Sequence, residues 1–122
     1  MTKILVIDDE IEFNEMLCLR LEKTGGYETF KAFDGIEGLE AAKKNNPDLI
    51  ILDIMMPKMN GFEVYEHLIE DNATKSIPVV VLTASANPDT AKKLLAKGAT
   101  DILTKPFEAK DLLALIGKVL KK

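Results

Sequence analysis

The 122-residue sequence has a single cysteine, Cys18, a single histidine, His67, and no long hydrophobic run. One cysteine cannot form an internal disulfide, which favours a reducing compartment. The chain also lacks the Cys and His cluster that zinc prefers, and we expect His67 to be a solvated helical residue. The longest apolar runs have four or five residues, whereas a membrane helix needs about 20.

Basic residues are in the minority, since 16 Lys and Arg face 20 Asp and Glu for a formal net charge of −4. No block of Lys or Arg gathers on a predicted face, apart from Lys121 and Lys122 at the end of the chain. Direct binding of nucleic acid needs such a basic patch. We therefore expect no direct nucleic-acid partner.

The chain has the length of one domain and is 47% hydrophobic, enough to bury a core. Its first residues, MTKILVIDD, contain an apolar run that is too short for a secretory signal. We expect a single cytoplasmic domain over residues 1–122 with no membrane contact. The natural-looking start and the short basic end favour a single-domain protein over a piece of a longer one.

Apolar runs without polar alternation recur at 4–7, 49–52 and 79–82. Such runs are typical of strands that are buried on both faces of a parallel sheet. Residues 27–33 and 101–104 are predicted as two further strands, the first of them at an edge of the sheet.

Between these runs, apolar residues recur at helical spacing. The predicted helices cover 10–23, 35–45, 61–71, 87–97 and 108–120. In the first of them, the apolar positions are Phe13, Met16, Leu17 and Leu21.

Caps and breakers support these helix boundaries: Gly25 and Gly26 end the first helix, and Asp34 caps the second. Strands that alternate with helices predict an α/β fold with a doubly wound parallel sheet of five strands.

Polar residues follow the predicted strands: Asp8 and Asp9, then Asp53, Thr83 and Lys105. Ligands of such sheets bind outside the carboxyl ends of the strands. Any one of these residues could serve as a helix cap, but three carboxylates at one rim repel unless a cation lies among them. Carboxylate oxygens suit Mg²⁺.

A divalent cation and the ammonium of Lys105 together can hold a phosphoryl group. An Asp carboxylate can itself be the nucleophile and form an aspartyl phosphate. Asp53, alone at the end of a central strand, fits that role best, and the hydroxyl of Thr83 could donate to a phosphoryl oxygen.

Four motifs carry a resemblance: VIDDE at 6–10, LDIMMPKMNG at 52–61, VVLTA at 80–84 and TKPF at 104–107. With these motifs the whole chain resembles the receiver domain of bacterial two-component response regulators, chemotaxis receivers among them. The resemblance implies a flavodoxin-like sheet with strand order 2-1-3-4-5, the order known from chemotaxis receivers.

The resemblance also implies roles for the residues at the rim. Asp53 matches the phosphoacceptor, Asp9 a direct ligand of Mg²⁺ or Mn²⁺, and Asp8 an acid that acts mainly through water. Met55 matches the position whose backbone carbonyl binds the metal, and Lys105 matches the lysine that binds the phosphoryl group.

For the switch, the resemblance assigns Thr83 as the hydroxyl that moves toward the phosphoryl group. The family often has an aromatic residue three positions before Lys105, but this chain has Ile102. Ile102 has no ring to rotate, so we do not expect a large aromatic flip. The output face would be the fourth helix, fifth strand and fifth helix, roughly 89–118, shifted between two conformations.

The implied partners are a sensor histidine kinase or histidine phosphotransfer protein as donor, and a downstream protein effector. The implied assembly is a monomer or a weak dimer that depends on phosphorylation. The candidates for donor docking are Ile11, Asn14, Glu15, Cys18, Pro106 and Phe107.

Three alternatives compete with this interpretation. An Asp-based phosphatase usually has a second acid two residues past its nucleophile, where this chain has Met55, so we expect no enzyme beyond self-phosphorylation and slow autodephosphorylation. A flavodoxin-like flavin carrier is disfavoured because residues 8–10 are acidic and would repel a phosphate. A receiver-like adaptor that is never phosphorylated remains open.

Overall fold

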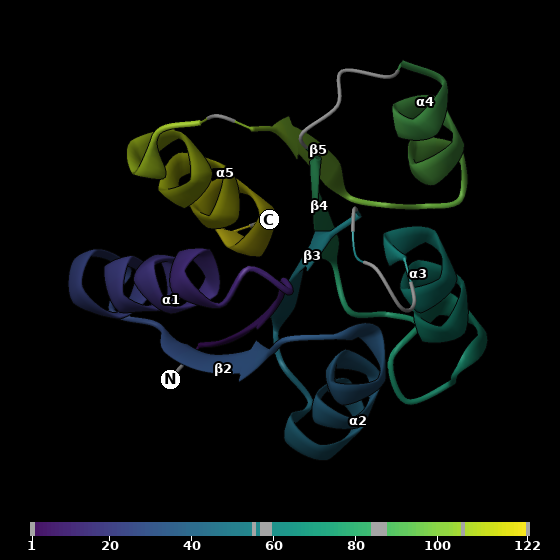
Figure 1. The fold of residues 1–122 in the computed structure, drawn as a ribbon, viewed down its shortest axis with the longest axis horizontal. Helices are drawn as coiled ribbons and strands as arrows, with labels where there is room; N and C mark the ends of the chain where they lie inside the picture. The colour runs from purple at the N-terminus through teal and green to yellow at the C-terminus, as the bar shows by residue number, and fades with distance from the viewer. Residues whose placement is uncertain (1, 55, 57–59, 84–87, 106, 122) are drawn as a thin grey trace.

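The computed structural model describes residues 2–54, 56, 60–83, 88–105 and 107–121. In these ranges five strands alternate with five helices (Figure 1). Their bounds are β1 Lys3–Ile7, α1 Ile11–Gly25, β2 Glu28–Ala32, α2 Gly35–Asn45, β3 Leu49–Asp53, α3 Gly61–Glu70, β4 Val79–Thr83, α4 Pro88–Ala96, β5 Asp101–Thr104 and α5 Ala109–Lys121.

The strands form one parallel sheet in the order β2-β1-β3-β4-β5, as the resemblance implied. β2 lies at an edge, which confirms that prediction. α1 and α5 cover one face of the sheet, and α2, α3 and α4 cover the other (Figure 1). No helix in the described ranges has the length and apolar character that crossing a membrane requires.

The central strands are buried on both faces, and for this reason their sequences show no polar alternation. All of β3 and β4 is buried. Successive residues of a strand point to opposite faces, so Ile4 packs in the α1 and α5 layer while Leu5 packs in the α2 to α4 layer. Full burial of each such side chain contributes about 1.5–3 kcal/mol.

The helix ends follow local chemistry. The side chain of Asp34 accepts a hydrogen bond from the Glu37 amide at 2.8 Å, which confirms the predicted cap of α2. Gly26, with φ of 71°, ends α1 in the left-handed conformation, whereas Gly25 is still the last helical residue.

The predicted apolar positions of α1 need one correction. The side that faces the sheet contains Asn14, Leu17, Cys18 and Leu21, which are buried. Met16 is 69% exposed, because two residues along a helix correspond to a turn of about 200°. Its position therefore lies almost opposite Cys18, away from the sheet.

α3 begins in close contact with the end of β3. The Gly61 amide donates to the Ile54 carbonyl at 2.9 Å. A Cβ atom at position 61 would lie 2.4 Å from the Ile54 Cα and 2.8 Å from the Asp53 carbonyl oxygen. Both neighbours are backbone atoms at the end of the central strand, so a side chain here forces the strand end and the helix apart.

We expect Gly61→Ala to lower the free energy of unfolding by about 1–3 kcal/mol because of this overpacking. Gly117→Ala is the matched control, since a Cβ at this position of α5 meets nothing within 4 Å. It should raise stability by about 0.5–1 kcal/mol through helix propensity. Denaturant unfolding of both variants checks the pair, and equal stabilities would contradict the close-contact account.

Candidate functional site

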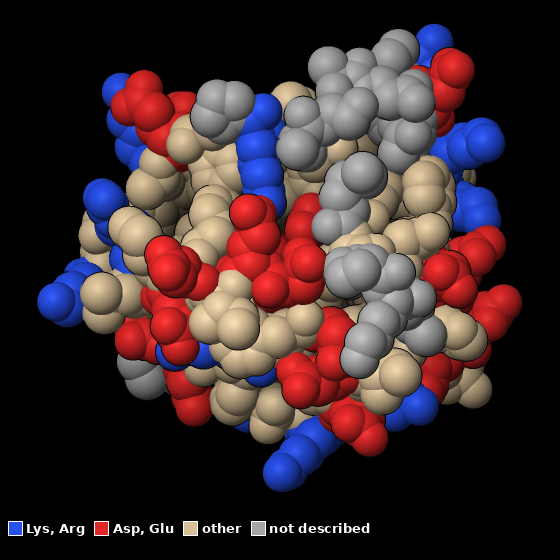
Figure 2. All heavy atoms as spheres, in the orientation of Figure 1, with Lys and Arg blue, Asp and Glu red and all other residues tan. Residues whose placement is uncertain are grey.

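Three carboxylates meet at the carboxyl ends of β1 and β3. Asp8 and Asp9 follow β1, and Asp53 is the last residue of β3, the neighbouring strand. One carboxylate oxygen from each lies within 4.8 Å of the others. Asp8 and Asp53 are buried, whereas Asp9 is half-buried. Figure 2 shows acidic side chains at the centre of this face, beside a basic side chain.

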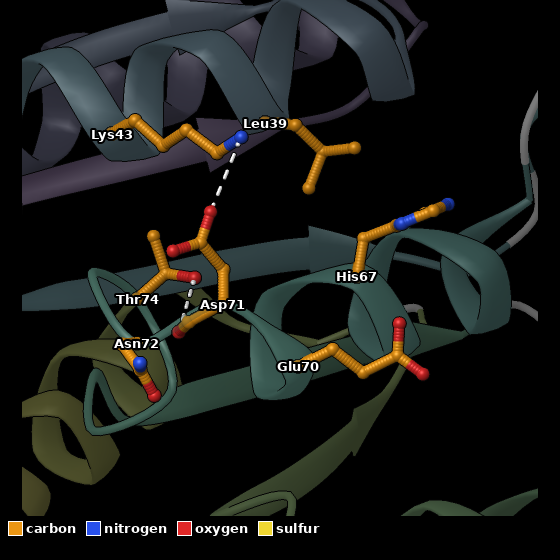
Figure 3. A pocket seen from close by; sticks show the side chains of 7 residues that line it. All are labelled: Leu39, Lys43, His67, Glu70, Asp71, Asn72 and Thr74. Carbon is orange, nitrogen blue, oxygen red and sulfur yellow. Dashed lines mark hydrogen bonds and ion pairs between the residues drawn. The ribbon is translucent and has the colours of Figure 1, made fainter.

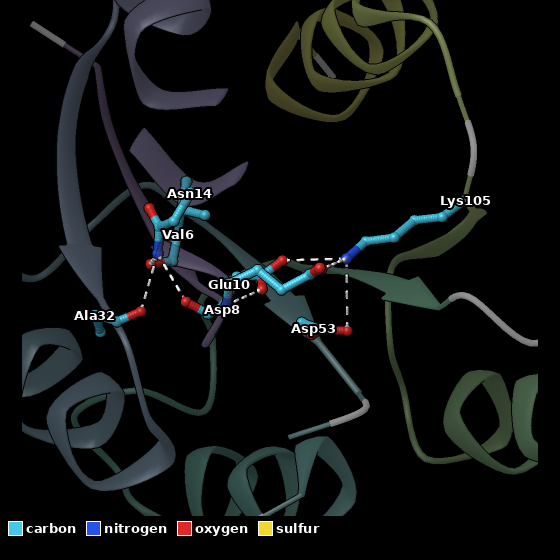
Figure 4. Close-up of polar contacts among 7 residues, drawn as sticks. All are labelled: Val6, Asp8, Glu10, Asn14, Ala32, Asp53 and Lys105. Carbon is cyan, nitrogen blue, oxygen red and sulfur yellow. Dashed lines mark hydrogen bonds and ion pairs between the residues drawn. The ribbon is translucent and has the colours of Figure 1, made fainter. Parts of the chain in front are cut away.

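Lys105, just beyond β5, brings the matching positive charge. Its ammonium lies 3.2 Å from Asp8 Oδ2, 3.2 Å from Glu10 Oε1 and 4.0 Å from Asp53 Oδ1 (Figure 4). The Lys105 amide also donates to the Thr83 carbonyl at 2.8 Å. The end of β5 is thus tied to β4 through the backbone and to β1 and β3 through charge.

An aromatic pair supports Lys105 from the side of α1 and α5. The ammonium lies 4.3 Å from the centre of the Phe13 ring, in cation–π contact. The Phe13 ring in turn packs edge-on against Phe107, with ring centres 6.1 Å apart. The lysine is therefore fixed in place by a ring as well as by carboxylates.

Burial and charge act in opposite directions on the ionisable groups of the site. Burial raises the pKa of Asp8, although the Glu10 amide and the Lys105 ammonium lower it in part. Burial alone would lower the pKa of Lys105, but the carboxylates of Asp53 and Asp8 outweigh it, and the pKa is raised. Lys105 therefore stays charged at neutral pH.

The donor set fits a hard divalent cation. Asp8, Asp9 and Asp53 offer carboxylate oxygens only, the ligands that Mg²⁺ prefers. One ammonium cannot neutralise all the carboxylates around it, and a bound cation would stabilise the ionised form of buried Asp8. Met55, the predicted carbonyl ligand, lies outside the described residues.

The predicted switch residues lie on the face of the sheet that α4 covers. Thr83 ends β4 and is 7% exposed. Strand alternation places it on the same face as Val81, and Val81 pairs with Ile102 of β5. Ile102 is half-buried and packs against the core of the α2 to α4 layer.

The prediction that Asn14 and Cys18 lie on the docking surface is wrong. Asn14 and Cys18 are both 0% exposed, because they lie on the side of α1 that faces the sheet. Burial also raises the pKa of the Cys18 thiol. Ile11, at 56% exposed, and Glu15 do lie on the surface.

A further docking candidate, Phe107, precedes α5. Phe107 is half-buried beside an apolar groove of about 230 Å³ between α1 and α5. Pro106 lies outside the described residues. The groove is lined by Phe13, Met16, Leu17, Arg20, Phe107 and Ala109.

A larger hollow of about 430 Å³ lies between α2 and α3 and contains none of Asp8, Asp9 and Asp53 (Figure 3). Lys43 and Asp71 form an ion pair of 3.2 Å at its wall. His67 lies at its margin and is exposed, as expected.

Asn14 has a different function from the one predicted. Its side-chain amide donates to the carbonyls of Val6, Asp8 and Ala32 at 3.3, 3.1 and 3.0 Å (Figure 4). It thereby joins the ends of β1 and β2 to α1 and holds the backbone that presents Asp8 and Asp9. The signal in the sequence was a polar residue on the same helical side as Leu17 and Leu21.

Glu10 and Phe13 were also missed as neighbours of Lys105. Glu10 belongs to the VIDDE motif, and Phe13 was assigned to the apolar positions of its helix. Their contacts join positions more than 90 residues apart in the sequence, as the hydrogen bond from Lys105 to Glu10 does. Helical and strand spacing do not report such contacts.

Comparison with known proteins gives a consistent result. The family model of the response regulator receiver domain matches residues 4–117. The chain is 39% identical over 122 residues to the DNA-binding dual master transcriptional regulator RpaA of Synechocystis, covering 100% of this chain and 50% of that protein. It is 38% identical to the phosphate regulon regulatory protein PhoB of Escherichia coli, covering 98% and 52%.

The chain thus spans about half the length of these two curated relatives. Among solved structures, the chemotaxis protein CheY4 of Vibrio cholerae superposes with a TM-score of 0.91 at 38% identity. That similarity covers 98% of this chain and 99% of the chemotaxis protein.

We expect Asn14→Leu to lower the free energy of unfolding by about 2–4 kcal/mol, because buried carbonyls lose their donor. It should also weaken Mg²⁺ binding severalfold, since the backbone of residues 8–10, which presents Asp8 and Asp9, loses its support. Denaturant unfolding and Mg²⁺ titration calorimetry measure the two effects.

Thr74→Val is the matched control for this variant. Thr74 is a buried polar residue whose hydroxyl donates to the Leu68 carbonyl at 2.7 Å, in the segment between α3 and β4 that contributes no residue to the Asp8, Asp9 and Asp53 cluster. It should cost about 1–2 kcal/mol and leave Mg²⁺ affinity unchanged. If folded Asn14→Leu binds Mg²⁺ as tightly as this control does, Asn14 supports the fold alone.

Proposed function

Because the chain belongs to the response regulator receiver domain family, we propose that it accepts a phosphoryl group on Asp53 in a Mg²⁺-dependent reaction. The observation that carries the proposal is the position of Asp53: it is 3% exposed, grouped with Asp8 and Asp9, and 4.0 Å from the Lys105 ammonium. The family acts in two-component signal transduction, and its receiver domains are not enzymes in the usual sense.

In the proposed reaction, an Asp53 carboxylate oxygen attacks the phosphorus of a phosphohistidine. An O–P bond forms, and the P–N bond breaks with its electron pair left on the imidazole nitrogen of the donor. The Lys105 ammonium is placed to bind a phosphoryl oxygen. Asp8, Asp9 and Asp53, with the Met55 carbonyl as predicted ligand, would hold Mg²⁺, which would supply charge stabilisation of the phosphoryl oxygens.

For the output, we propose that the Thr83 hydroxyl donates to the phosphoryl oxygen and shifts the face made by α4, β5 and α5. The backbone bond from Lys105 to the Thr83 carbonyl couples the ends of β4 and β5. Ile102 on β5 follows this movement as a packed aliphatic side chain. A downstream protein effector would read the altered face.

The phosphoryl donor is proposed to be a histidine kinase or histidine phosphotransfer protein that docks on α1 and the start of α5. Exposed Ile11 and Glu15 lie on α1. The apolar groove with Met16 and Phe107 is also lined by Phe13, whose ring contacts the Lys105 ammonium. We further propose a cytoplasmic, single receiver domain over residues 1–122 that is monomeric or dimerises weakly on phosphorylation. The domain makes no direct nucleic-acid contact in this proposal.

Incubation with phosphoramidate and Mg²⁺ should add one phosphoryl group to the native protein, measured by intact mass. The gain should require Mg²⁺ and be absent in Asp53→Asn, which keeps the shape of the side chain. Lys105→Ala should slow the reaction by about 100- to 1,000-fold, as for the loss of one stabilising donor.

Two results would contradict this assignment. One is labelling that persists in Asp53→Asn, which would place the phosphoryl group elsewhere. The other is a native protein that never gains mass, as expected for a receiver-like adaptor that is not phosphorylated.

Met16→Asp should reduce phosphoryl transfer from a phosphorylated histidine phosphotransfer protein by about tenfold or more, because a charge then enters an apolar contact surface. Labelling by phosphoramidate should not change. Ile36→Asp is the control, since Ile36 is a comparably exposed apolar residue at 58% on α2. Equal loss of transfer in both variants, or none in either, would remove the groove from the proposed docking surface.

A further inference from the structure

We infer that Glu10 is the resting counter-ion of Lys105 and limits the rate at which Asp53 takes a phosphoryl group from an anionic donor. The Glu10 carboxylate is paired with the Lys105 ammonium, which the incoming phosphoryl group must also reach. This inference rests on the proposed function of Asp53 and adds to it a residue that sets the rate.

The contacts distinguish Glu10 from the other acids around Lys105. Glu10 Oε1 is as close to the ammonium as Asp8 Oδ2, at 3.2 Å (Figure 4). Yet Glu10 is not among the three acids whose oxygens group together within 4.8 Å. Glu10 therefore neutralises the lysine without belonging to the candidate cation site.

The exposure of the two partners decides which of them gives way. The Asp8 side chain is 0% exposed and that of Glu10 is 66% exposed. The Lys105 side chain is 16% exposed, but water can reach the Glu10 carboxylate and replace Lys105 as its partner, so Glu10 can turn away at small cost. Asp8 cannot turn away in the same manner, because its side chain is fully buried and its Oδ1 accepts a hydrogen bond from the Glu10 amide.

The backbone of Glu10 stays in place when its side chain moves. The Glu10 amide donates to Asp8 Oδ1 at 2.9 Å, and the residue precedes α1 with extended φ and ψ of −77° and 100°. The Glu10 side chain makes no capping hydrogen bond to α1. Release of the Glu10 carboxylate thus leaves the start of α1 and the backbone of residues 8–10 unchanged.

Among the described groups around the Lys105 ammonium, the Glu10 carboxylate is the anion that a phosphoryl oxygen can replace. The Phe13 ring covers one side of Lys105 at 4.3 Å, while Asp8 and Asp53 approach from the strand ends. A lysine ammonium has three donors. An incoming phosphoryl oxygen needs one of them, and the carboxylate that solvent can take up is that of Glu10.

The test compares Glu10→Gln with Glu12→Gln. Glu12 is an exposed acid in the first turn of α1, so both variants remove one negative charge from the same helix start. Phosphorylation by phosphoramidate with Mg²⁺ is followed by intact mass over time. We expect Glu10→Gln to react about three- to tenfold faster, and Glu12→Gln to stay within about twofold of the native rate.

A second comparison shows whether the gain passes through Lys105. In a Lys105→Ala background, adding Glu10→Gln should give no more acceleration than adding Glu12→Gln, because the contact is already lost. Mg²⁺ affinity of Glu10→Gln, measured by calorimetry, should match the native value.

Three results would overturn the inference. These are a Glu10→Gln rate equal to or below that of Glu12→Gln, a full gain in the Lys105→Ala background, and a large loss of Mg²⁺ affinity, which would make Glu10 a metal ligand. Failure of the proposed function is recognised separately, because the native protein then gains no phosphoryl group.

Discussion

The ammonium of Lys105 is the charge on which the organisation of the site depends. It comes from the end of β5 and compensates carboxylates that β1, β3 and the residue before α1 bring to the same place. Asp8 and Asp53 are buried, and like charges that lie so close together repel one another unless a cation is near. The lysine thus allows the strand ends to approach, and its aromatic support fixes the direction of its long side chain.

Much of the fold could be predicted because the cause lies in short-range sequence patterns. Continuous apolar runs such as 49–52 identify strands that are buried on both faces, and Asp34 and Gly26 mark helix ends through their own backbone chemistry. The meeting of Asp8, Asp9 and Asp53 also followed, since parallel neighbouring strands end at one edge.

The errors share a physical origin. The resemblance placed Asn14 and Cys18 on the docking surface through their position in the first helix, but the helix turns both side chains toward the sheet. Asn14 is tolerated there only because three carbonyls at the strand ends take up its donors. Likewise, the contacts of Lys105 with Glu10 and Phe13 join distant parts of the chain. A one-dimensional pattern contains no information on such pairs.

The division of the core into two layers has a consequence for how such a domain can diverge. Neighbouring residues of one strand, Ile4 and Leu5 for example, belong to different layers. A side chain that is substituted in the α1 and α5 layer therefore packs against one set of neighbours. A side chain that is substituted in the α2 to α4 layer packs against another. Substitutions on one side of the sheet can therefore be accepted, in nature or by protein engineering, with little re-optimisation of the side chains that pack on the other side.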